Sequence, residues 1–420
     1  MLTCFVALFC TALTGCQGGK GVPPPARSPD TLNPLIPSFY HSTDDILQRF
    51  ETLSKGGCGK GVSVTLDKHG DSPALISALF KTTTGDKQKK KVFFLFGEHA
   101  RELISPETAL QMAEDLCMLH ENSKIWAQTV LGHSEIFMIP IANPLGRYSV
   151  ERGNTCQRVN ENGVDLNRNW ESHWEADEAS YGSDVYPGKQ AFSEPETKTL
   201  KAIVDKYAPS MFVTVHSGTL GMYTPYAYST DVPHDDPSDL GNMVKIIDKL
   251  NPEYCECPSG PAGKEVGYLC PGTCLDYAYD KTKTKYSFAF EIYSKDAEDI
   301  HDQYHQSHSH SLLETGNGHA HGHHHHHHPE YSCFIQASEE SSHSLLNRLT
   351  PEECVPYFNP ITKSEYEKVK TKWSEAFLKM IDMAHGAQEN GPPTREMVSS
   401  PAKAAIESML RGNAVKTKGA

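Results

Sequence analysis

The 420-residue sequence lacks an excess of positive charge, is modest in apolar content and contains no repeats. Its 39 Lys and Arg residues are outnumbered by 53 Asp and Glu residues, which gives a formal net charge of −14. An acidic surface repels phosphate backbones and no basic cluster offsets it, so we expect no nucleic-acid partner. Hydrophobic residues make up 38% of the chain, too little for a membrane protein, and Gly and Pro show no fibrous period.

The amino-terminal residues 1–13 carry no charge and are mostly apolar. This run is too short to span a bilayer but matches the apolar part of a secretory signal. We therefore expect a signal peptide over residues 1–16, a secreted or lumenal protein and no transmembrane segment. Leu13–Cys16 (LTGC) is also similar to a bacterial lipobox, which would place a lipid on Cys16.

Twelve cysteines point to the same oxidising compartment, and nine of them follow the expected signal peptide. Cys255, Cys257, Cys270 and Cys274 lie close together, with spacings that are poor matches to structural zinc sites. We therefore expect disulfides among them. Because nine is an odd number, at least one thiol stays free or pairs outside the chain.

The remaining sequence predicts one alternating domain. A Pro- and Gly-rich linker over residues 17–37 precedes a catalytic domain over residues 38–385, and a polar tail covers residues 386–420. Apolar and periodic segments predict strands at 62–66, 92–97, 135–140, 211–216 and 286–293, and helices from Ser105, at 196–207 and at 366–384. We expect Ser105 to cap its helix, with Pro106 in the first turn. The alternation predicts an α/β sheet with helices on both faces.

A polar, low-complexity insertion interrupts this domain at about residues 297–345. Twelve histidines lie between His301 and His328, and the last six are consecutive. Such a segment cannot bury a core, so we expect it to be disordered. Imidazole tracts bind divalent metals, so extra metal ions on the insertion are expected, and a metal-sequestering or metal-sensing protein is an alternative function.

Two histidines and a glutamate at the ends of expected strands could hold a metal ion. His99 and Glu102 follow the buried strand at 92–97, where open α/β sheets place their ligands. His216 ends the strand at 211–216 and offers a third donor. Each residue alone is better explained as structural, but two His and one Glu form a known catalytic zinc set that leaves a fourth position for water.

Glu291 and Arg168 add groups that a hydrolase needs. Glu291 lies within an apolar strand, where a carboxylate is costly unless it is paired or functional. Arg168 lies between two Asn residues, just after a short segment that contains Val164 and Leu166. A salt-bridged glutamate and a solvated turn are the ordinary explanations for each. Together with the three ligands, the two residues describe a zinc hydrolase with a general base and an arginine for an anionic substrate.

In these motifs and their order the chain resembles the zinc metallocarboxypeptidases of the carboxypeptidase A/B type, from about Tyr40 to Ala384. The motifs are His99-x-x-Glu102, Asn143–Arg147 (NPLGR), Val164–Trp170 (VDLNRNW), His216-Ser217 and Tyr286–Glu291 (YSFAFE). The resemblance implies a single-domain mixed eight-stranded sheet sandwiched between helices. It also implies one catalytic Zn²⁺ and peptide or protein C-termini as substrates.

The resemblance assigns a role to each matched residue. The implied zinc ligands are His99, Glu102 and His216, the implied general base is Glu291, and the arginine that polarises the scissile carbonyl is Arg158. The implied substrate-binding residues are Arg101, Asn167, Arg168 and Tyr268, of which the last three hold the terminal carboxylate. Exopeptidase action follows from Arg168, because an internal peptide bond offers no carboxylate for its guanidinium.

The resemblance to this family is ungapped from Tyr268 to Asp280, and it implies that Leu275 lies on the floor of the pocket for the substrate's C-terminal side chain. Relatives with an acidic residue there accept Lys and Arg, and those with an aliphatic residue accept apolar side chains. Leu275 has no charge to pair with a buried ammonium, so we expect release of aliphatic or aromatic residues. The alternatives are a B-type preference for Lys or Arg, a glutamate-trimming activity, and an inactive relative that only binds peptide C-termini.

Overall fold

The computed structural model describes residues 32–70, 75–83, 85, 88–231, 238–314 and 349–386. The expected signal peptide, the lipobox-like Leu13–Cys16, most of the linker, the six consecutive histidines and nearly all of the tail lie outside these residues. Within the described part of the chain, no helix combines the length and the apolar character needed to cross a bilayer.

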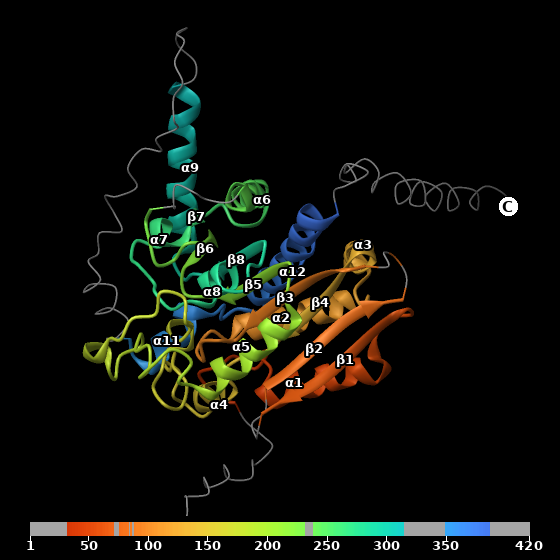
Figure 1. Cartoon of the computed structure of the whole chain (residues 1–420), viewed down its shortest axis with the longest axis horizontal. Coiled ribbons are helices and arrows are strands. Elements are labelled where there is room, and N and C mark those ends of the chain that lie inside the picture. Colours follow the sequence, from red (N-terminus) through yellow and green to blue (C-terminus); the bar gives the residue numbers. More distant parts are fainter. Residues whose placement is uncertain are drawn as a thin grey trace, which may run out of the picture. The chain divides into compact units, whose positions relative to one another are not determined.

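A mixed eight-stranded sheet organises the described chain, in the order β1-β2-β4-β3-β5-β8-β6-β7 (Figure 1). The strands are β1 Val62–His69, β2 Leu75–Thr82, β3 Lys90–Phe96, β4 Ser134–Ile139, β5 Met211–His216, β6 Leu220–Thr224, β7 Ser259–Pro261 and β8 Tyr286–Ile292. The central strands β4, β3, β5 and β8 are parallel, whereas β1, β2 and β6 pair antiparallel with β2, β4 and β8. The five expected strands are confirmed, and β2, β6 and β7 were not expected.

Helices cover both faces of this sheet, which confirms the expected α/β architecture. They are α1 Thr43–Thr52, α2 Ile104–Leu116, α3 Lys124–His133, α4 Pro144–Glu151, α5 Pro195–Tyr207, α6 Ser238–Tyr254, α7 Ala262–Glu265, α8 Cys274–Asp280, α9 Ala297–Glu314, α11 Pro351–Phe358 and α12 Lys363–His385. Along β3, Phe94 and Phe96 pack into the core cluster that holds α2 and α12. Phe93 and Leu95 point to the other face and pack with α5.

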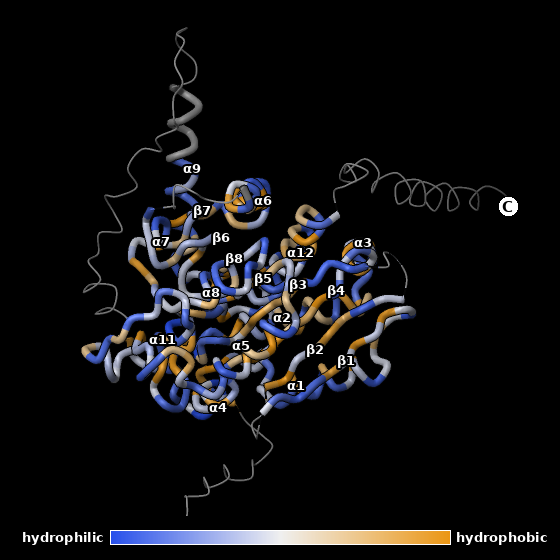
Figure 2. Tube along the Cα trace, in the orientation of Figure 1, coloured by the Kyte–Doolittle hydropathy of each residue, from blue (hydrophilic) through white to orange (hydrophobic). Residues whose placement is uncertain are grey.

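The interior strand β3 is buried on both faces, as its continuous apolar run predicts. Every residue from Val92 to Phe96 has no exposed surface. Figure 2 shows the same contrast in hydropathy, with orange along parts of the sheet and mostly blue along the coloured part of α9. The connections at the carboxyl end of this buried strand are therefore anchored to a rigid base.

Ser105 does not cap α2, contrary to expectation. The helix begins at Ile104, and Ser105 lies inside its first turn. Its hydroxyl donates to the Val215 carbonyl at 2.6 Å and accepts the Gly97 N–H at 3.1 Å. A tertiary hydrogen bond to β5 has thus taken the place of the local cap, and it ties the start of α2 to the neighbouring strand ends.

The structure describes parts of two segments whose bounds were predicted from the sequence. Ile36, in the expected linker, is only 4% exposed, and the Asn33 N–H donates to the Glu151 carbonyl, so the end of this segment packs on the domain. The helix α9 occupies the first part of the insertion that was expected to be disordered. Residues 297–314 contain no Gly or Pro, and acidic residues in the first turn favour a helix there.

Among the described cysteines, three disulfides join Cys58 to Cys117, Cys156 to Cys354 and Cys255 to Cys257. The expected pairing among the clustered cysteines is confirmed for Cys255 and Cys257 and wrong for the other two. Cys270 and Cys274 are buried free thiols. They face different partners, since Cys270 contacts Arg168 and Cys274 contacts Glu98.

Candidate active site

The candidate residues lie at the carboxyl ends of three adjacent parallel strands. His99 and Glu102 are in the connection from β3 to α2, and His216 is the last residue of β5. Glu291 lies near the end of β8, directly opposite His216 in the parallel register. Neighbouring residues in register point to the same face of a sheet, so Glu291 is held beside His216 by backbone pairing.

Three side chains converge on one point, as a metal site requires. The Nδ1 atoms of His99 and His216 are 3.1 Å apart. The Glu102 carboxylate reaches both rings, with 2.7 Å from Oε1 to His99 Nδ1 and 3.2 Å from Oε2 to His216 Nδ1. The three ligand atoms lie within 4.8 Å of one another, and all three residues are buried. Across the described residues, no second group of His, Cys, Asp and Glu converges in this way.

The outer nitrogen of each imidazole ring has an oxygen partner. His99 Nε2 lies 3.1 Å from Asp165 Oδ1, and His216 Nε2 lies 2.8 Å from Thr214 Oγ1. Such partners fix the tautomer and the orientation of metal-binding histidines. Sequence reasoning missed Asp165 as a functional residue, although it lies in the motif VDLNRNW, because its distance to His99 depends on the fold.

The chemistry of the donor set fits zinc. Two imidazoles and one carboxylate are a known catalytic zinc set, and both Nδ1 atoms converge with the Glu102 carboxylate. The Asp165–His99 contact adds the carboxylate that often backs a zinc-binding histidine. His99, Glu102 and His216 would therefore hold the ion.

Glu291 lies beside the donor set without belonging to it. Its Oε2 atom is buried and has no hydrogen-bond partner among the described residues. Burial, and then the negative charge of Glu102, raise the pKa of the Glu291 carboxyl to about 7. A carboxyl in this state can accept and release a proton near neutral pH.

Arg158 is held next to the same centre. Its Nε donates to Asp165 Oδ2 at 3.0 Å, and its Nη1 lies 3.6 Å from Glu102 Oε1. The Ala100 N–H donates to the Arg158 carbonyl, which fixes this segment against the metal-ligand segment. Burial lowers the pKa of the guanidinium, but Asp165 and Glu102 more than offset this and raise it above its usual value.

Arg101 is engaged by protein groups on several sides. Its Nη1 donates to the Cys156 carbonyl at 2.9 Å and to Asp184 Oδ2 at 2.5 Å. Its guanidinium carbon lies 4.1 Å from the centre of the Phe358 ring in α11. In these positions Arg101 joins the Arg158 segment to α11, and its implied contact with substrate stays a prediction.

The residues implied to hold the substrate carboxylate come from two segments. Asn167 and Arg168 lie in a single 3-10 turn, Leu166–Arg168, that follows Asp165. Arg168 Nη2 donates to the Cys270 sulfur at 3.2 Å. Burial, and then the neighbouring Cys270, raise the pKa of Tyr268 to about 12, while Arg168 and Arg158 lower it. Tyr268 is therefore electrostatically coupled to both arginines.

Leu275 belongs to a small apolar cluster next to these residues. The cluster also contains Tyr223, Ala227, Ala262 and Cys270, with Tyr268, Val266 and Ala289 packed against it. The neighbouring Asp276 does not present its carboxylate to this cluster as a free charge. It accepts the N–H groups of Ala227 and Tyr228 at 3.0–3.1 Å, and burial raises its pKa to about 7.

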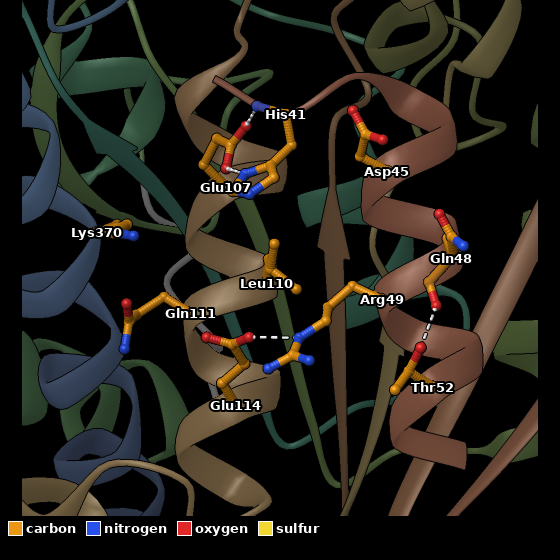
Figure 3. Close-up of a pocket in the computed structure, with 10 residues that line it drawn as sticks. All are labelled: His41, Asp45, Gln48, Arg49, Thr52, Glu107, Leu110, Gln111, Glu114 and Lys370. Atoms are coloured by element: carbon orange, nitrogen blue, oxygen red, sulfur yellow. Dashed lines mark hydrogen bonds and ion pairs between the residues drawn. The ribbon is translucent and has the colours of Figure 1, made fainter. Parts of the chain in front are cut away.

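A separate groove of about 300 Å³ lies between α1, α2 and Lys370 of α12 (Figure 3). None of the candidate residues lines it. Four of its lining side chains are paired with one another, since His41 contacts Glu107 and Arg49 contacts Glu114. The groove therefore shares no lining residue with the proposed metal ligands His99, Glu102 and His216.

Comparisons with known proteins agree on one family. A family profile described as zinc carboxypeptidase matches residues 65–319, more than half of the chain. Carboxypeptidase A2 of Rattus norvegicus is 28% identical over 268 residues, which cover 60% of this chain and 62% of that protein. Carboxypeptidase B of Astacus astacus is 28% identical over 229 residues, which cover 51% of this chain and 74% of that protein. The chain spans about three fifths of the length of the first of these relatives.

Solved structures show the same fold. The crystal structure of thrombin activatable fibrinolysis inhibitor matches with a TM-score of 0.57 and 20% identity, covering 82% of this chain and 74% of that one. Carboxypeptidase A from Helicoverpa armigera matches with a TM-score of 0.51 and 22% identity, covering 66% of this chain and 73% of that one.

Proposed function

Because the chain belongs to the zinc carboxypeptidase family, we propose that it is a zinc-dependent exopeptidase that hydrolyses the C-terminal bond of peptides or proteins. The observation that carries this proposal is the buried group His99, Glu102 and His216 with the unpartnered carboxylate of Glu291 beside it. An inactive scaffold would have no need to keep an unpartnered carboxylate in so costly a place.

The side chains divide the work of hydrolysis between them. When bound, zinc supplies Lewis acidity at the three ligands. Glu291 accepts a proton from the attacking water at its free Oε2 and returns it to the leaving amine. Arg158 donates to the oxygen on which negative charge develops, a role typically worth ~3 kcal/mol. Its bond to Asp165 sets the position of the guanidinium in advance.

Arg168 and Asn167 bind the terminal carboxylate in this proposal. The Arg168 Nη2 group is 3.2 Å from the Cys270 sulfur, a weak acceptor that a carboxylate can replace. A charge-assisted pair of N–H bonds to carboxylate is stronger than a bond to a thiol. The gain on binding a free C-terminus therefore selects substrate ends over internal peptide bonds.

The apolar cluster around Leu275 supports a preference for aliphatic or aromatic C-terminal residues. A Lys or Arg side chain would have to leave water without an ion-pair partner from Leu275, and the Asp276 carboxylate already accepts backbone N–H groups. An apolar side chain gains roughly 1.5–3 kcal/mol on full burial. A B-type preference is the second candidate, because carboxypeptidase B also lies among the relatives.

We also propose that the chain is secreted or lumenal, which the three disulfides support.

The proposed activity is tested by measuring which C-terminal residues the purified protein releases from peptides. Peptides ending in Leu, Phe, Lys, Arg and Glu are compared, with and without a chelator. Matched peptides with an amidated C-terminus are the control, since they offer Arg168 no carboxylate. We expect chelator-sensitive release of Leu and Phe and none from the amidated peptides. Cleavage of the amidated peptides would contradict exopeptidase action.

A further inference from the structure

Glu98 is a buried carboxylate that has no part in the chemistry proposed above. It directly precedes His99 and is only 1% exposed. Its Oε1 accepts the indole N–H of Trp170 at 3.1 Å, and its Oε2 accepts the thiol of Cys274 at 3.5 Å. The same Oε2 lies 3.7 Å from His216 Nε2. A carboxylate in such a position is costly unless its contacts serve a purpose.

These contacts join the three parts of the candidate site. Trp170 follows the turn that carries Asn167 and Arg168. Cys274 begins α8 and directly precedes Leu275. His216 is one of the metal donors. One carboxylate therefore lies against a proposed metal ligand, the residue that follows the carboxylate-binding turn, and the first residue of the helix that carries Leu275.

The two substrate segments are already bound to each other without Glu98. The backbone N–H of Trp170 donates to the Gly272 carbonyl at 3.0 Å, and the backbone N–H of Cys274 donates to Asn167 Oδ1 at 3.0 Å. Trp170 has no exposed surface, so its ring cannot rearrange cheaply. Glu98 adds a bond from this rigid pair to the segment that carries His99 and Glu102.

We propose that Glu98 is a positioning residue, which holds His216 in place and sets the distance between the metal donors and the substrate-binding segments. It acts through His216 and Trp170 and does not touch the substrate. The inference rests on the proposed function, since it assigns the position of groups in that site. Partners behind metal-binding histidines are typically worth 10–100-fold in metal affinity or activity.

The first test compares the zinc affinity of the parent with that of Glu98→Gln, measured by competition with a chromophoric chelator. Gln keeps the size of the side chain and can still accept the Trp170 indole N–H, but it puts an amide NH2 group in place of the oxygen that lies 3.7 Å from His216 Nε2. We expect zinc affinity to fall about 10–100-fold, with the melting temperature of the metal-free protein close to that of the parent.

Glu107→Gln is the matched control. Glu107 is as buried as Glu98 and accepts bonds from His41 and Tyr366, but it lies in the groove of Figure 3. Its loss should lower the melting temperature and leave zinc affinity unchanged. The proposal is overturned if Glu98→Gln lowers zinc affinity no more than Glu107→Gln does.

The second test uses Trp170→Phe, which removes the indole N–H and leaves Glu98 beside His216. We expect zinc affinity within a few-fold of the parent and a higher KM for peptides with a free C-terminus, because the Arg168 segment loses its bond to Glu98. An unchanged KM would overturn the link to the substrate segments. If the parent releases no C-terminal residue, the proposed function fails, and the zinc affinities still decide the part of Glu98 at His216.

Discussion

Two carboxylates at one centre suit different roles because their partners differ. Burial by itself acts to raise the pKa of both Glu102 and Glu291. Glu102 also accepts contacts from His99, His216 and the Ser217 N–H, and the two imidazoles bring its pKa below the usual value. Glu291 has a free oxygen and a pKa of about 7. Glu102 therefore suits a permanent ligand, and Glu291 suits a group that exchanges protons.

Glu291→Gln should abolish most turnover and leave the zinc content unchanged. The amide cannot take a proton from water, and general-base catalysis typically contributes about 10²–10⁴-fold. Turnover of a peptide ending in Leu and the metal content after dialysis measure the two effects. Glu102→Gln is the control and should lose both turnover and metal. Loss of zinc from Glu291→Gln would reassign Glu291 to the metal.

Leu275→Asp should shift the preference from apolar C-terminal residues toward Lys and Arg. The new carboxylate would lie in the cluster of Tyr223, Ala262 and Cys270, where it can pair with a cationic side chain. The ratio of kcat/KM for peptides ending in Lys and in Leu measures the shift. Leu275→Asn is the matched control, which should lose activity on Leu without gaining activity on Lys. If the parent already prefers Lys, Arg or Glu, the pocket is assigned wrongly.

At the scale of elements, sequence patterns locate the strands that carry the site. The apolar run of β3 and the ending of β5 at His216 predict that ligands gather at one edge of the sheet, and the structure brings the ligands together there. The pairing of His216 with Glu291 is not readable from sequence, because it depends on β5 and β8 being neighbours. The short strands β6 and β7 contain Gly and Pro and were missed for that reason.

The helix α11 contributes to the site through contacts that span much of the chain. Its Cys354 is bonded to Cys156 across a sequence separation of 198 residues. Phe358 lies under the guanidinium of Arg101, and the Thr155 hydroxyl donates to the Pro351 carbonyl. No local pattern in the sequence signals such contacts, so the sequence could not predict that a segment after the His-rich insertion supports the active site.

The junction of α1, α2 and α12 should depend on pH through His41. A hydrogen bond to Glu107 raises the pKa of His41 above its usual 6.5, against an opposing effect of burial. Protonated His41 therefore stabilises the fold below about pH 6.5, and this contribution is lost as pH rises through the raised value. His41→Gln should lower the melting temperature more at a pH of about 5.5 than at about 8.5.

His69→Gln is the control for this prediction and should show the opposite trend. Burial lowers the pKa of His69, so its protonation opposes folding at low pH. Its replacement should therefore cost less stability at low pH than at high pH. Thermal unfolding of the two variants and the parent across pH tests both signs, and equal shifts for both variants would contradict the assignment to His41.

At the scale of the whole molecule, the order of motifs indicates the family because three of them place candidate groups at the carboxyl ends of β3, β5 and β8. The expected α/β sheet, the proposed metal ligands and the proposed base Glu291 follow from residues whose type and position are unusual for their strand. Asp165 and Glu98 were not predicted as functional residues, because a buried carboxylate within or beside a motif has no distinctive pattern. Their roles depend on distances to His99 and His216 that only the folded chain fixes.

Deletion of His323–His328 should leave turnover on small peptides within a few-fold of the parent. These residues lie outside the described part of the chain, show no apolar periodicity and are well away in sequence from every proposed site residue. The deletion keeps Cys354 and Phe358, so the support of Arg101 is retained.

Phe358→Ala supplies the contrast, since it removes the ring beneath the Arg101 guanidinium and leaves the histidines in place. Loss of this ring removes about 0.5–2 kcal/mol of cation–π attraction to the Arg101 guanidinium. Because Arg101 also donates to the Cys156 carbonyl in the Arg158 segment, we expect a lower kcat/KM. Turnover and melting temperature are measured for both variants. If the deletion abolished turnover with an unchanged melting temperature while Phe358→Ala did not, the histidine tract rather than α11 would contribute to catalysis. The expected order of the two effects is the reverse, because α11 is bonded to the Arg158 segment through the disulfide between Cys354 and Cys156.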